Sequence, residues 1–501
     1  MEHRVKLTFY GGINKVGGNK VLLEDLGYDV KIFLDFGINT SEFSKFRKDF
    51  PYTNEIKALT DCHVLPREID IPIKDIYSKY FIFNHTNSQY PQKVKECEGK
   101  VDPPTDLDGI LISHPHRDHY RGISFVNRNI PIYTGVVTKR IIKAYSRSSA
   151  QRFENFLHGL KWILFRTGNV IQIKKLVIYP IHVDHSIPAA YGFIICTSAG
   201  IIVYTGDFRM HGPLQLMTAD LIKKVKDVCK TKGQIESDFT YREGRVIALI
   251  CEGTHIHKGS IESERIVKRH LRKLFKIIPF DYAIVQYGRV DWDRFRTYVD
   301  IAKKYNWKYI ISDKDAYFYN RLNKKAIYDS MKDPNIENTD NIVILLQEKR
   351  KFQWKEDVNQ MLKNIGKSER IMHLSDLKDL NKNFFLYITS IYDYDIIKNY
   401  LPKDLRGVFI SSNVDPYAEE YRMDKRFIST DLLDRGVPSY RVHASGHSKP
   451  HDIIRFVNEI NPEKLIPIHT EHPDFFRKLF KGERLEVVLP IYNIPFDITS
   501  S

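Results

Sequence analysis

The chain has 501 residues, more than one ordinary hydrophobic core accommodates and enough for two domains. Hydrophobic residues make up 42% of it, which excludes a globally disordered protein. Lys and Arg number 77 against 62 Asp and Glu, so the net charge is +15, which favours a polyanionic partner without proving one.

No stretch approaches the roughly 18 apolar residues that a membrane span requires, and residues 1–20 contain no secretory signal. We therefore expect a cytoplasmic protein without a membrane partner. No two of the five cysteines form a C-x-x-C pair, and Cys196 and Cys251 lie in apolar, strand-like runs. Reduced thiols are the expected state.

The first part of the chain predicts short strands, because segments rich in β-branched and aromatic residues alternate with Gly or Asp turns. The predicted strands are 5–11, 19–24, 29–37, 109–113, 170–183, 189–198 and 201–208. Residues 38–106 are less regular and carry mixed charges, so they are interpreted as a long insertion.

After residue 258 strands and helices alternate, which is typical of a parallel sheet covered by helices. The first helix is predicted over 261–276, with Ser260 as N-cap and Glu262 and Glu264 in its first turn. The following elements are strands 282–288, 308–312, 341–346, 384–389 and 407–412, helices 291–305 and 392–401, then helix 449–460 and strand 464–470.

The strongest chemical signal is His114-Pro-His116-Arg-Asp118-His119, directly after the apolar strand 109–113. Imidazole and carboxylate groups are ligands that Zn²⁺ accepts. His114 and His116 alternate and can face one ion, whereas Asp118 and His119 are adjacent and suit a second. Four such groups on one loop are unfavourable without a neutralising cation, so the motif predicts a metal site.

Two further ligand candidates follow predicted strands downstream. His185 lies in HVDHSIP and Asp207 in YTGDFRM. Alone, Asp207 is interpreted as a turn residue; together with the upstream motif, it is predicted to bridge two cations about 3.5–4 Å apart.

The order H-x-H-x-D-H, then His, then Asp resembles the metallo-β-lactamase superfamily. Asp35, in FLDFG, matches the family's first motif, whose Asp supports the ligand loop. Glu252 in ICEGT, His447 in HASGHS and His469 in IPIHTEH resemble the three additional motifs of the β-CASP nucleases. The Gly-rich segment GGINKVGGN (11–19) resembles the opening of ribonuclease J and its archaeal relatives.

This resemblance implies an α/β fold: a metallo-β-lactamase αββα sandwich with an inserted β-CASP domain, a parallel sheet flanked by helices. The implied division is 1–257 for the first part of the sandwich (with the insertion at about 38–106), 258–439 for the β-CASP domain and 440–501 for the last part. Only 32 residues follow His469, so a minimal enzyme closest to archaeal ribonuclease J is expected. A homodimer stays open.

The resemblance also implies the role of each site residue. One zinc is assigned to His114, His116 and His185, the other to Asp118, His119 and His469, with Asp207 bridging both. His447 is the candidate general acid, oriented by Glu252. The residues with expected catalytic roles are Asp118, Asp207, Glu252 and His447, and those expected to contact substrate phosphate are His443, Ser445 and Gly446.

The expected function is a dizinc ribonuclease that hydrolyses single-stranded RNA from 5′ to 3′ and prefers a 5′ monophosphate, with additional internal cutting left open. Alternatives are a DNA nuclease of the same subfamily, since the chemistry needs no 2′-hydroxyl, a catalytically silent RNA-binding paralogue, and a small-molecule esterase or lactamase. The basic stretch Lys268, Arg269, Arg272 and Lys273 is interpreted as a solvated helix face, with phosphate binding left open.

Overall fold

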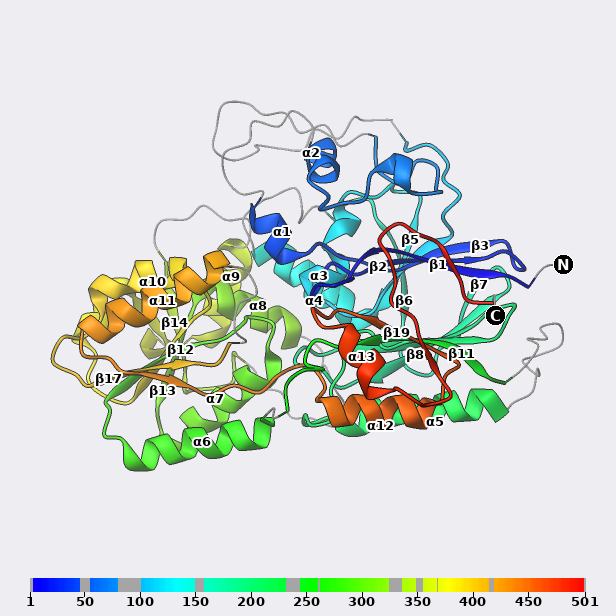
Figure 1. Cartoon of the computed structure of the whole chain (residues 1–501). Helices are drawn as coiled ribbons and strands as arrows, with labels where there is room; N and C mark the ends of the chain where they lie inside the picture. Colours follow the sequence, from blue (N-terminus) through cyan, green and yellow to red (C-terminus); the bar gives the residue numbers. More distant parts are fainter. Residues whose placement is uncertain are drawn as a thin grey trace. The chain divides into compact units, whose positions relative to one another are not determined.

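The computed structural model describes residues 3–45, 55–79, 101–148, 157–230, 244–259, 262–323, 336–347, 355–366, 368–413 and 419–499. The chain divides into two compact units (Figure 1). The first comprises Met1–Lys139, Gln151–Ser260 and Gly446–Ser501, and the second Arg140–Ala150 and Ile261–Ser445. None of the helices within the described ranges is long and apolar enough to cross a membrane.

The first sheet of unit 1 has the strand order β21-β1-β2-β3-β4-β5-β6. Its strands are β1 Val5–Gly11, β2 Lys20–Asp25, β3 Val30–Phe36, β4 Gly109–Ile112, β5 Pro131–Gly135, β6 Lys161–Phe165 and β21 Phe496–Asp497. Pairing is antiparallel from β21 to β3 and parallel from β3 to β6. The parallel half therefore places the carboxyl ends of β3 and β4 at one edge.

The second sheet of unit 1 has the order β20-β19-β11-β10-β9-β8-β7. Its strands are β7 Ile171–Ile173, β8 Leu176–Val183, β9 Ala190–Cys196, β10 Ile201–Tyr204, β11 Val246–Glu252, β19 Lys464–Ile468 and β20 Glu486–Val487. β7 to β10 pair antiparallel, and β10, β11, β19 and β20 pair parallel. The carboxyl ends of β8, β10, β11 and β19 consequently share one edge.

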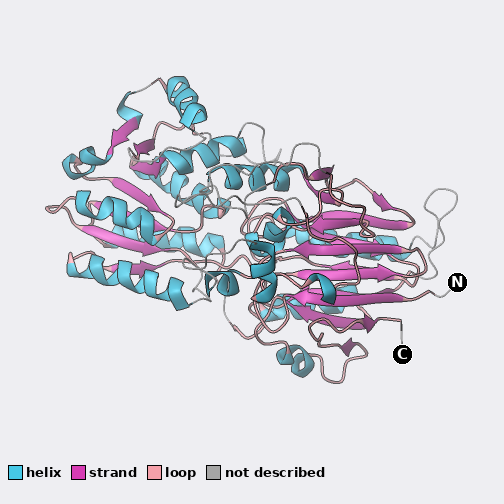
Figure 2. Cartoon of the chain, turned by 90° about the horizontal axis from the view of Figure 1, so that it is seen from above, coloured by secondary structure: helices cyan, strands magenta, loops and turns pink. Residues whose placement is uncertain are grey.

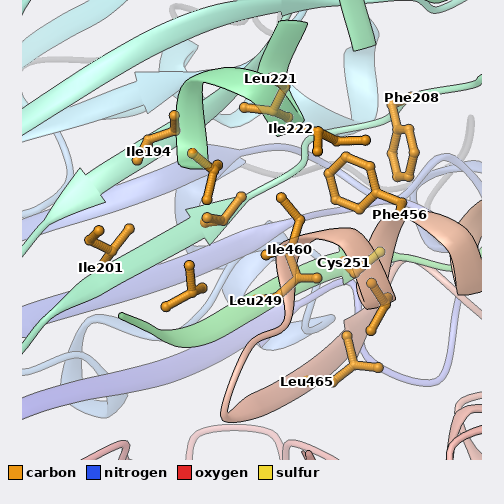
Figure 3. Close-up of a cluster of buried hydrophobic side chains, with 14 of the residues drawn as sticks. Ile194, Ile201, Phe208, Leu221, Ile222, Leu249, Cys251, Phe456, Ile460 and Leu465 are labelled. Atoms are coloured by element: carbon orange, nitrogen blue, oxygen red, sulfur yellow. The ribbon is translucent and has the colours of Figure 1, made fainter. Parts of the chain in front are cut away.

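The two sheets of unit 1 pack face to face. Phe165 of β6 contacts Tyr191 and Phe193 of β9, with ring centroids 4.9 and 5.9 Å apart. Helices α5 Gln215–Lys230 and α12 Pro450–Ile460 cover the outer face of the second sheet and close the apolar cluster of Figure 3. This is the sandwich expected from the sequence.

The sequence of helix α12 explains why this helix packs on the outer face of the second sheet. Ile453, Phe456, Val457 and Ile460 are its buried residues, and their helical spacing forms one apolar stripe. Pro450 occupies the first turn, where a missing N–H costs nothing, and Asn461 ends the helix in the left-handed conformation.

Unit 2 contains one parallel sheet of order β15-β14-β13-β16-β12-β17-β18. Its strands are β12 Tyr282–Gln286, β13 Lys308–Ser312, β14 Ile342–Leu346, β15 Ile371–His373, β16 Phe384–Ile388, β17 Gly407–Ser411 and β18 Ser439–Arg441. Helices α6 Glu264–Ile277 and α7 Trp292–Tyr305 cover one face, and α10 Ile391–Ile397 and α11 Glu419–Asp434 the other (Figures 1 and 2). The α/β fold class predicted from the sequence is confirmed.

The remaining helices are α1 Thr40–Lys45, α2 Glu55–Asp61, α3 Arg117–Tyr120, α4 Val136–Ser148, α8 Asp313–Asn323, α9 Lys355–Ile365 and α13 Asp474–Leu479. The described part of segment 38–106 is less irregular than expected: it contains the helices α1 and α2, and several of its side chains are buried. Leu59 and Leu65 are fully buried, and Tyr77 bridges to Val126 beside β5. The segments 46–54 and 80–100 lie outside the described residues.

Several predicted elements differ in their limits from the observed ones, and three of them are informative. The strand 170–183 is a hairpin of β7 and β8, turned at Lys174 with a φ of 50°. β10 ends at Tyr204, because Gly206 with a φ of 56° takes the chain out of the strand. The first helix of unit 2 begins at Glu264, not at 261.

The N-cap of that helix is Ser263, whose side chain accepts a hydrogen bond from the Ile266 N–H. Ser260, the predicted cap, lies outside the described residues. The free cysteines within the described ranges are Cys62, Cys196, Cys229 and Cys251, of which Cys196 and Cys251 are buried. Cys97 falls outside those ranges.

Candidate metal centre

The topology of unit 1 gathers the predicted ligands. Asp207, Glu252 and His469 follow or end the parallel neighbours β10, β11 and β19. His185 follows β8 at the same edge, and His114 follows β4 of the facing sheet. Segments far apart in the chain thus deliver their side chains to one place.

His114, His116, His185 and Asp207 form a first group, with one ligand atom from each lying within 4.8 Å of the others. His116 Nδ1 lies 3.0 Å from both His114 Nε2 and His185 Nε2. Asp207 Oδ2 is 3.5 Å from His114 Nε2 and 3.9 Å from His185 Nε2.

Asp118, His119 and His469 form a second group by the same criterion. Asp118 Oδ2 lies 3.1 Å from His469 Nε2 and 3.8 Å from His119 Nε2. Asp207 Oδ2 approaches this group as well, at 3.2 Å from His119 Nε2 and 3.6 Å from His469 Nε2. Asp207 is therefore in reach of both groups.

The hydrogen bonding and electrostatics of these side chains suit a bound cation better than they suit a site without one. Within the described residues, the buried atoms Asp207 Oδ1 and His119 Nε2 have no hydrogen-bond partner, although such atoms are usually satisfied. Burial lowers the pKa of His116 to about 4 and, reinforced by neighbouring imidazoles, holds the pKa values of His114 and His185 well below their ordinary range. Neutral imidazole is the form that binds metal.

The electrostatic surroundings of His119 differ from those of the other three histidines. Burial alone would lower its pKa, but Asp207, Asp35 and Asp118 together raise it well above the ordinary value. A concentration of carboxylates that stabilises positive charge on an imidazole also stabilises a metal cation. The second group is therefore electrostatically suited to an ion.

His447 lies beside the cluster, with Nδ1 3.3 Å from Glu252 Oε1 and 3.9 Å from Asp207 Oδ2. Burial would lower the pKa of His447, but these two carboxylates outweigh it and raise the pKa. The Glu252 carboxylate is fixed in turn by the Thr254 and Ser448 N–H groups.

Thr254 was not recognised in the sequence. Its Oγ1 lies 2.8 Å from His469 Nδ1 and 3.1 Å from His447 Nδ1, so one hydroxyl orients both rings. The available signal was its position two residues after Glu252.

Asp35 is buried and holds the loop that follows β4. Its carboxylate accepts hydrogen bonds from the Ser113 N–H at 2.7 Å, from His119 Nδ1 at 2.6 Å and from the Tyr204 hydroxyl at 2.6 Å. Because His119 donates through Nδ1, its Nε2 faces the cluster. Asp35 has a φ of 57°, a conformation rare for a residue other than glycine.

The Gly-rich segment 11–19 has a role that sequence reasoning missed. The Gly18 and Asn19 N–H groups both donate to the Asp118 carbonyl at 3.1 Å. A Cβ on Gly17 would lie 2.4 Å from Asp118 Oδ2, and one on Gly37 only 1.6 Å from the Asp118 carbonyl oxygen. The glycines thus allow the backbone to enclose Asp118.

A buried ion pair joins two ligand loops. Arg209 Nε donates to Asp184 Oδ1 at 3.0 Å, and Asp184 also accepts from the Leu214 N–H. Asp184 directly precedes His185 and Arg209 is two residues after Asp207, so this pair fixes the spacing of their loops. Charged residues flanking the two ligands were the signal in the sequence.

The predicted phosphate contacts divide between the units. His443 and Ser445 belong to unit 2, where His443 Nδ1 donates to the Ser412 carbonyl at 2.7 Å. Gly446 belongs to unit 1, and its carbonyl accepts from His185 Nδ1. Gly446 therefore has an orienting role toward His185, which leaves Nε2 of that ring for the cluster.

Models of two protein families match separate parts of the chain. Residues 82–227 match the beta-lactamase superfamily domain, and residues 440–490 match the Zn-dependent metallo-hydrolase RNA specificity domain. A crystal structure of a protein of unknown function from Enterococcus faecalis V583 has a TM-score of 0.68 at 20% identity, covering 99% of this chain and 100% of that one. It shares the fold.

Several proteins with similar sequences carry the name ribonuclease J. Ribonuclease J from Sinorhizobium meliloti is 26% identical over 34% of this chain and 27% of its own length. Ribonuclease J 2 from Staphylococcus epidermidis and from Staphylococcus aureus are each 23% identical over 73% of this chain and 58% of their own lengths. The match thus spans little more than half of those relatives at most. The two domain matches and these relatives support a likeness to the β-CASP, ribonuclease J-like family of metallo-β-lactamase-fold proteins.

Proposed function

We propose that the protein is a dizinc hydrolase that cleaves phosphodiester bonds in single-stranded RNA. The observation that carries this proposal is the approach of both ligand groups to Asp207, which is the arrangement expected of a residue shared by two ions. The RNA specificity domain match and the ribonuclease J relatives support RNA as the substrate.

The ligands would be those predicted from the sequence: His114, His116 and His185 for one ion, Asp118, His119 and His469 for the other, and Asp207 for both. Zinc bound there supplies activation of water and neutralisation of phosphate charge. The protein contributes rigidity, because Asp35, Thr254 and Gly446 each fix the ring orientation of a ligand histidine.

His447 would donate a proton to the leaving oxygen. Glu252 holds its Nδ1, so Nε2 is the nitrogen that would hand over the proton. The carboxylates that raise its pKa favour the protonated ring, which is the form that a general acid requires. Proton transfer then turns the leaving alkoxide into a neutral hydroxyl group.

We further propose 5′-to-3′ removal of nucleotides, with His443, Ser445 and Gly446 contacting a 5′ monophosphate and internal cutting as a secondary activity. A hydroxyl and exposed N–H groups of a Ser-Gly turn suit an anion. The second unit would be the inserted β-CASP domain.

The test uses 5′-labelled RNA and DNA of the same sequence, with 5′ monophosphate or triphosphate ends, incubated with zinc or with chelator. The proposal expects chelator-sensitive release of mononucleotides, fastest from 5′-monophosphorylated RNA. Faster cleavage of DNA would make the protein a DNA nuclease, and RNA binding without any cleavage would make it a silent paralogue; either result contradicts the proposal.

A further inference from the structure

Helix α6 carries an unusual density of positive charge. Six of its 14 residues are Lys or Arg, and its acidic residue, Glu264, is buried. The cations are Arg265, Lys268, Arg269, Arg272, Lys273 and Lys276. Positions 265, 269, 272 and 276 recur at helical spacing, so they form one row along the helix.

The buried face of α6 fixes where this row points. Val267 and Leu271 are fully buried, and Glu264 pairs with the buried Arg294 of α7 at 2.8 Å. The row therefore faces outward. Of the six Lys and Arg side chains of α6, all in the described chain, only Lys268 has a carboxylate in ion-pair range, that of Asp300; the other carboxylate close to an α6 side chain, Glu262, lies 3.5 Å from His270. Unneutralised charge on this scale favours a polyanionic partner.

The row borders a hollow between α6 and the end of α7. This cavity has a volume of about 940 Å³, and its lining includes the α6 cations, Ser263, Lys304 and Tyr305. The Tyr305 ring stacks on Phe275 with centroids 4.8 Å apart and planes 15° apart, which holds it in place. A cationic groove with a fixed aromatic ring is the combination that binds single-stranded nucleic acid.

We propose that the α6 surface, defined as Arg265, Arg269, Arg272, Lys276, Lys304 and Tyr305, is a second RNA-binding surface that holds the backbone of the substrate strand. It lies in unit 2 and shares no residue with the metal centre. The proposal rests on the proposed function only for the identity of the polyanion. From position 265 to 276 the row extends roughly 16 Å, at 1.5 Å per residue, which is enough to meet successive phosphates.

The test measures RNA binding by the full chain, using fluorescence anisotropy in chelator so that no cleavage occurs. Wild type is compared with Arg269→Glu/Arg272→Glu, with the charge-preserving Arg269→Lys/Arg272→Lys, and with Lys223→Glu/Lys230→Glu. The last pair is exposed on α5 and provides an equal charge change elsewhere. Each variant is measured over a series of salt concentrations.

The expected result for Arg269→Glu/Arg272→Glu is at least about tenfold weaker binding and a log–log salt slope shallower by about 1.4, or 0.7 for each lost phosphate contact. The lysine pair should bind within about twofold of wild type, and so should the α5 pair. Equal weakening by the α5 pair would mean that net charge alone matters and would overturn the surface. If polyglutamate of equal total charge displaces the RNA, the assignment of the α6 surface to nucleic acid is overturned.

Failure of this inference is distinguishable from failure of the proposed function. If wild type binds and cleaves RNA while the α6 variant binds equally well, only the α6 surface is wrong. If wild type does not cleave RNA in zinc but the α6 variant still loses binding, the surface stands and the catalytic proposal falls.

Discussion

A single carboxylate sets the geometry of the proposed centre. Asp207 Oδ2 lies between 3.2 and 3.9 Å from nitrogen atoms of both ligand groups, while its Oδ1 is buried without a hydrogen-bond partner in the described residues. Removing this side chain should therefore affect both ions.

For Asp207→Ala, we expect less than a tenth of wild-type RNA hydrolysis and loss of bound metal, because the shared ligand is absent. Elemental analysis of the purified protein and a rate assay with labelled RNA give both readouts. The matched control is Asp220→Ala, an exposed carboxylate on α5. A variant that keeps both metals and more than a tenth of the activity would contradict the bridging role.

His447 and Glu252 should act as one unit. Each of His447→Gln and Glu252→Gln is expected to lower kcat by about 100-fold, the lower end of general acid catalysis. The double variant should be little slower than either single one, because Glu252 works through His447. Additive losses, measured as kcat under saturating RNA, would show that the two residues act separately.

Lys20 is buried, and its amine donates to the carbonyls of Gly18 and Gly37 at 3.0 and 2.8 Å. Burial lowers its pKa from 10.5 to about 7. Between these two pH values the unfolded chain binds the proton and the folded chain does not, so this group makes folding more favourable as pH rises from 7 toward 10.5.

The variant Lys20→Met should remove that part of the pH dependence. Urea unfolding at pH 7 and at pH 9.5 measures it as the change in unfolding free energy between the two conditions. Identical pH dependence in wild type and variant would mean that Lys20 stays charged in the folded protein.

The secondary-structure elements themselves were largely predictable. Strands such as 5–11 and 308–312 have the limits expected from runs of apolar and β-branched residues, because burial on both faces leaves a continuous hydrophobic signal. The strand limits that were predicted wrongly, at Lys174 and Gly206, depend on positive φ angles. Such conformations follow from the tertiary position of a turn more than from composition.

The side chains that the structure brings together as candidate ligands were predictable, because metal chemistry restricts which side chains can act. Their supports were not, since a residue such as Thr254 or Gly37 gains its role only when distant segments meet. The segment 11–19 illustrates this: its glycines suggest flexibility in the sequence, but in the fold they allow close approach to Asp118.

Gly37→Ala tests this enclosure. A Cβ there would lie 1.6 Å from the Asp118 carbonyl oxygen and 2.5 Å from the His119 nitrogen, so the loop must move. We expect metal content to fall from two ions toward one, since Asp118 and His119 belong to the same ligand group. The control is Gly288→Ala, where an added Cβ meets nothing within 4 Å. Full metal content in Gly37→Ala would show that the loop adapts without displacing its ligands.

The molecule as a whole consists of two units with separate cores. One apolar cluster includes Leu249 and Phe456 in unit 1, and another includes Ile284 and Leu432 in unit 2. All the proposed zinc ligands lie in unit 1. Metal binding should therefore stabilise one unit far more than the other.

Chelation provides the measurement. A ligand at 100 times its Kd stabilises the state that binds it by about 2.7 kcal/mol, and without metal the crowded imidazoles and carboxylates of unit 1 lose their shared counter-charge. Hydrogen exchange should then accelerate in β10 and β11 and stay unchanged in β12 and β16. Restoring zinc should reverse the effect, and Asp207→Ala should show it without chelator. Equal acceleration in all four strands would mean that the two units unfold together, and would contradict an independently folded inserted domain.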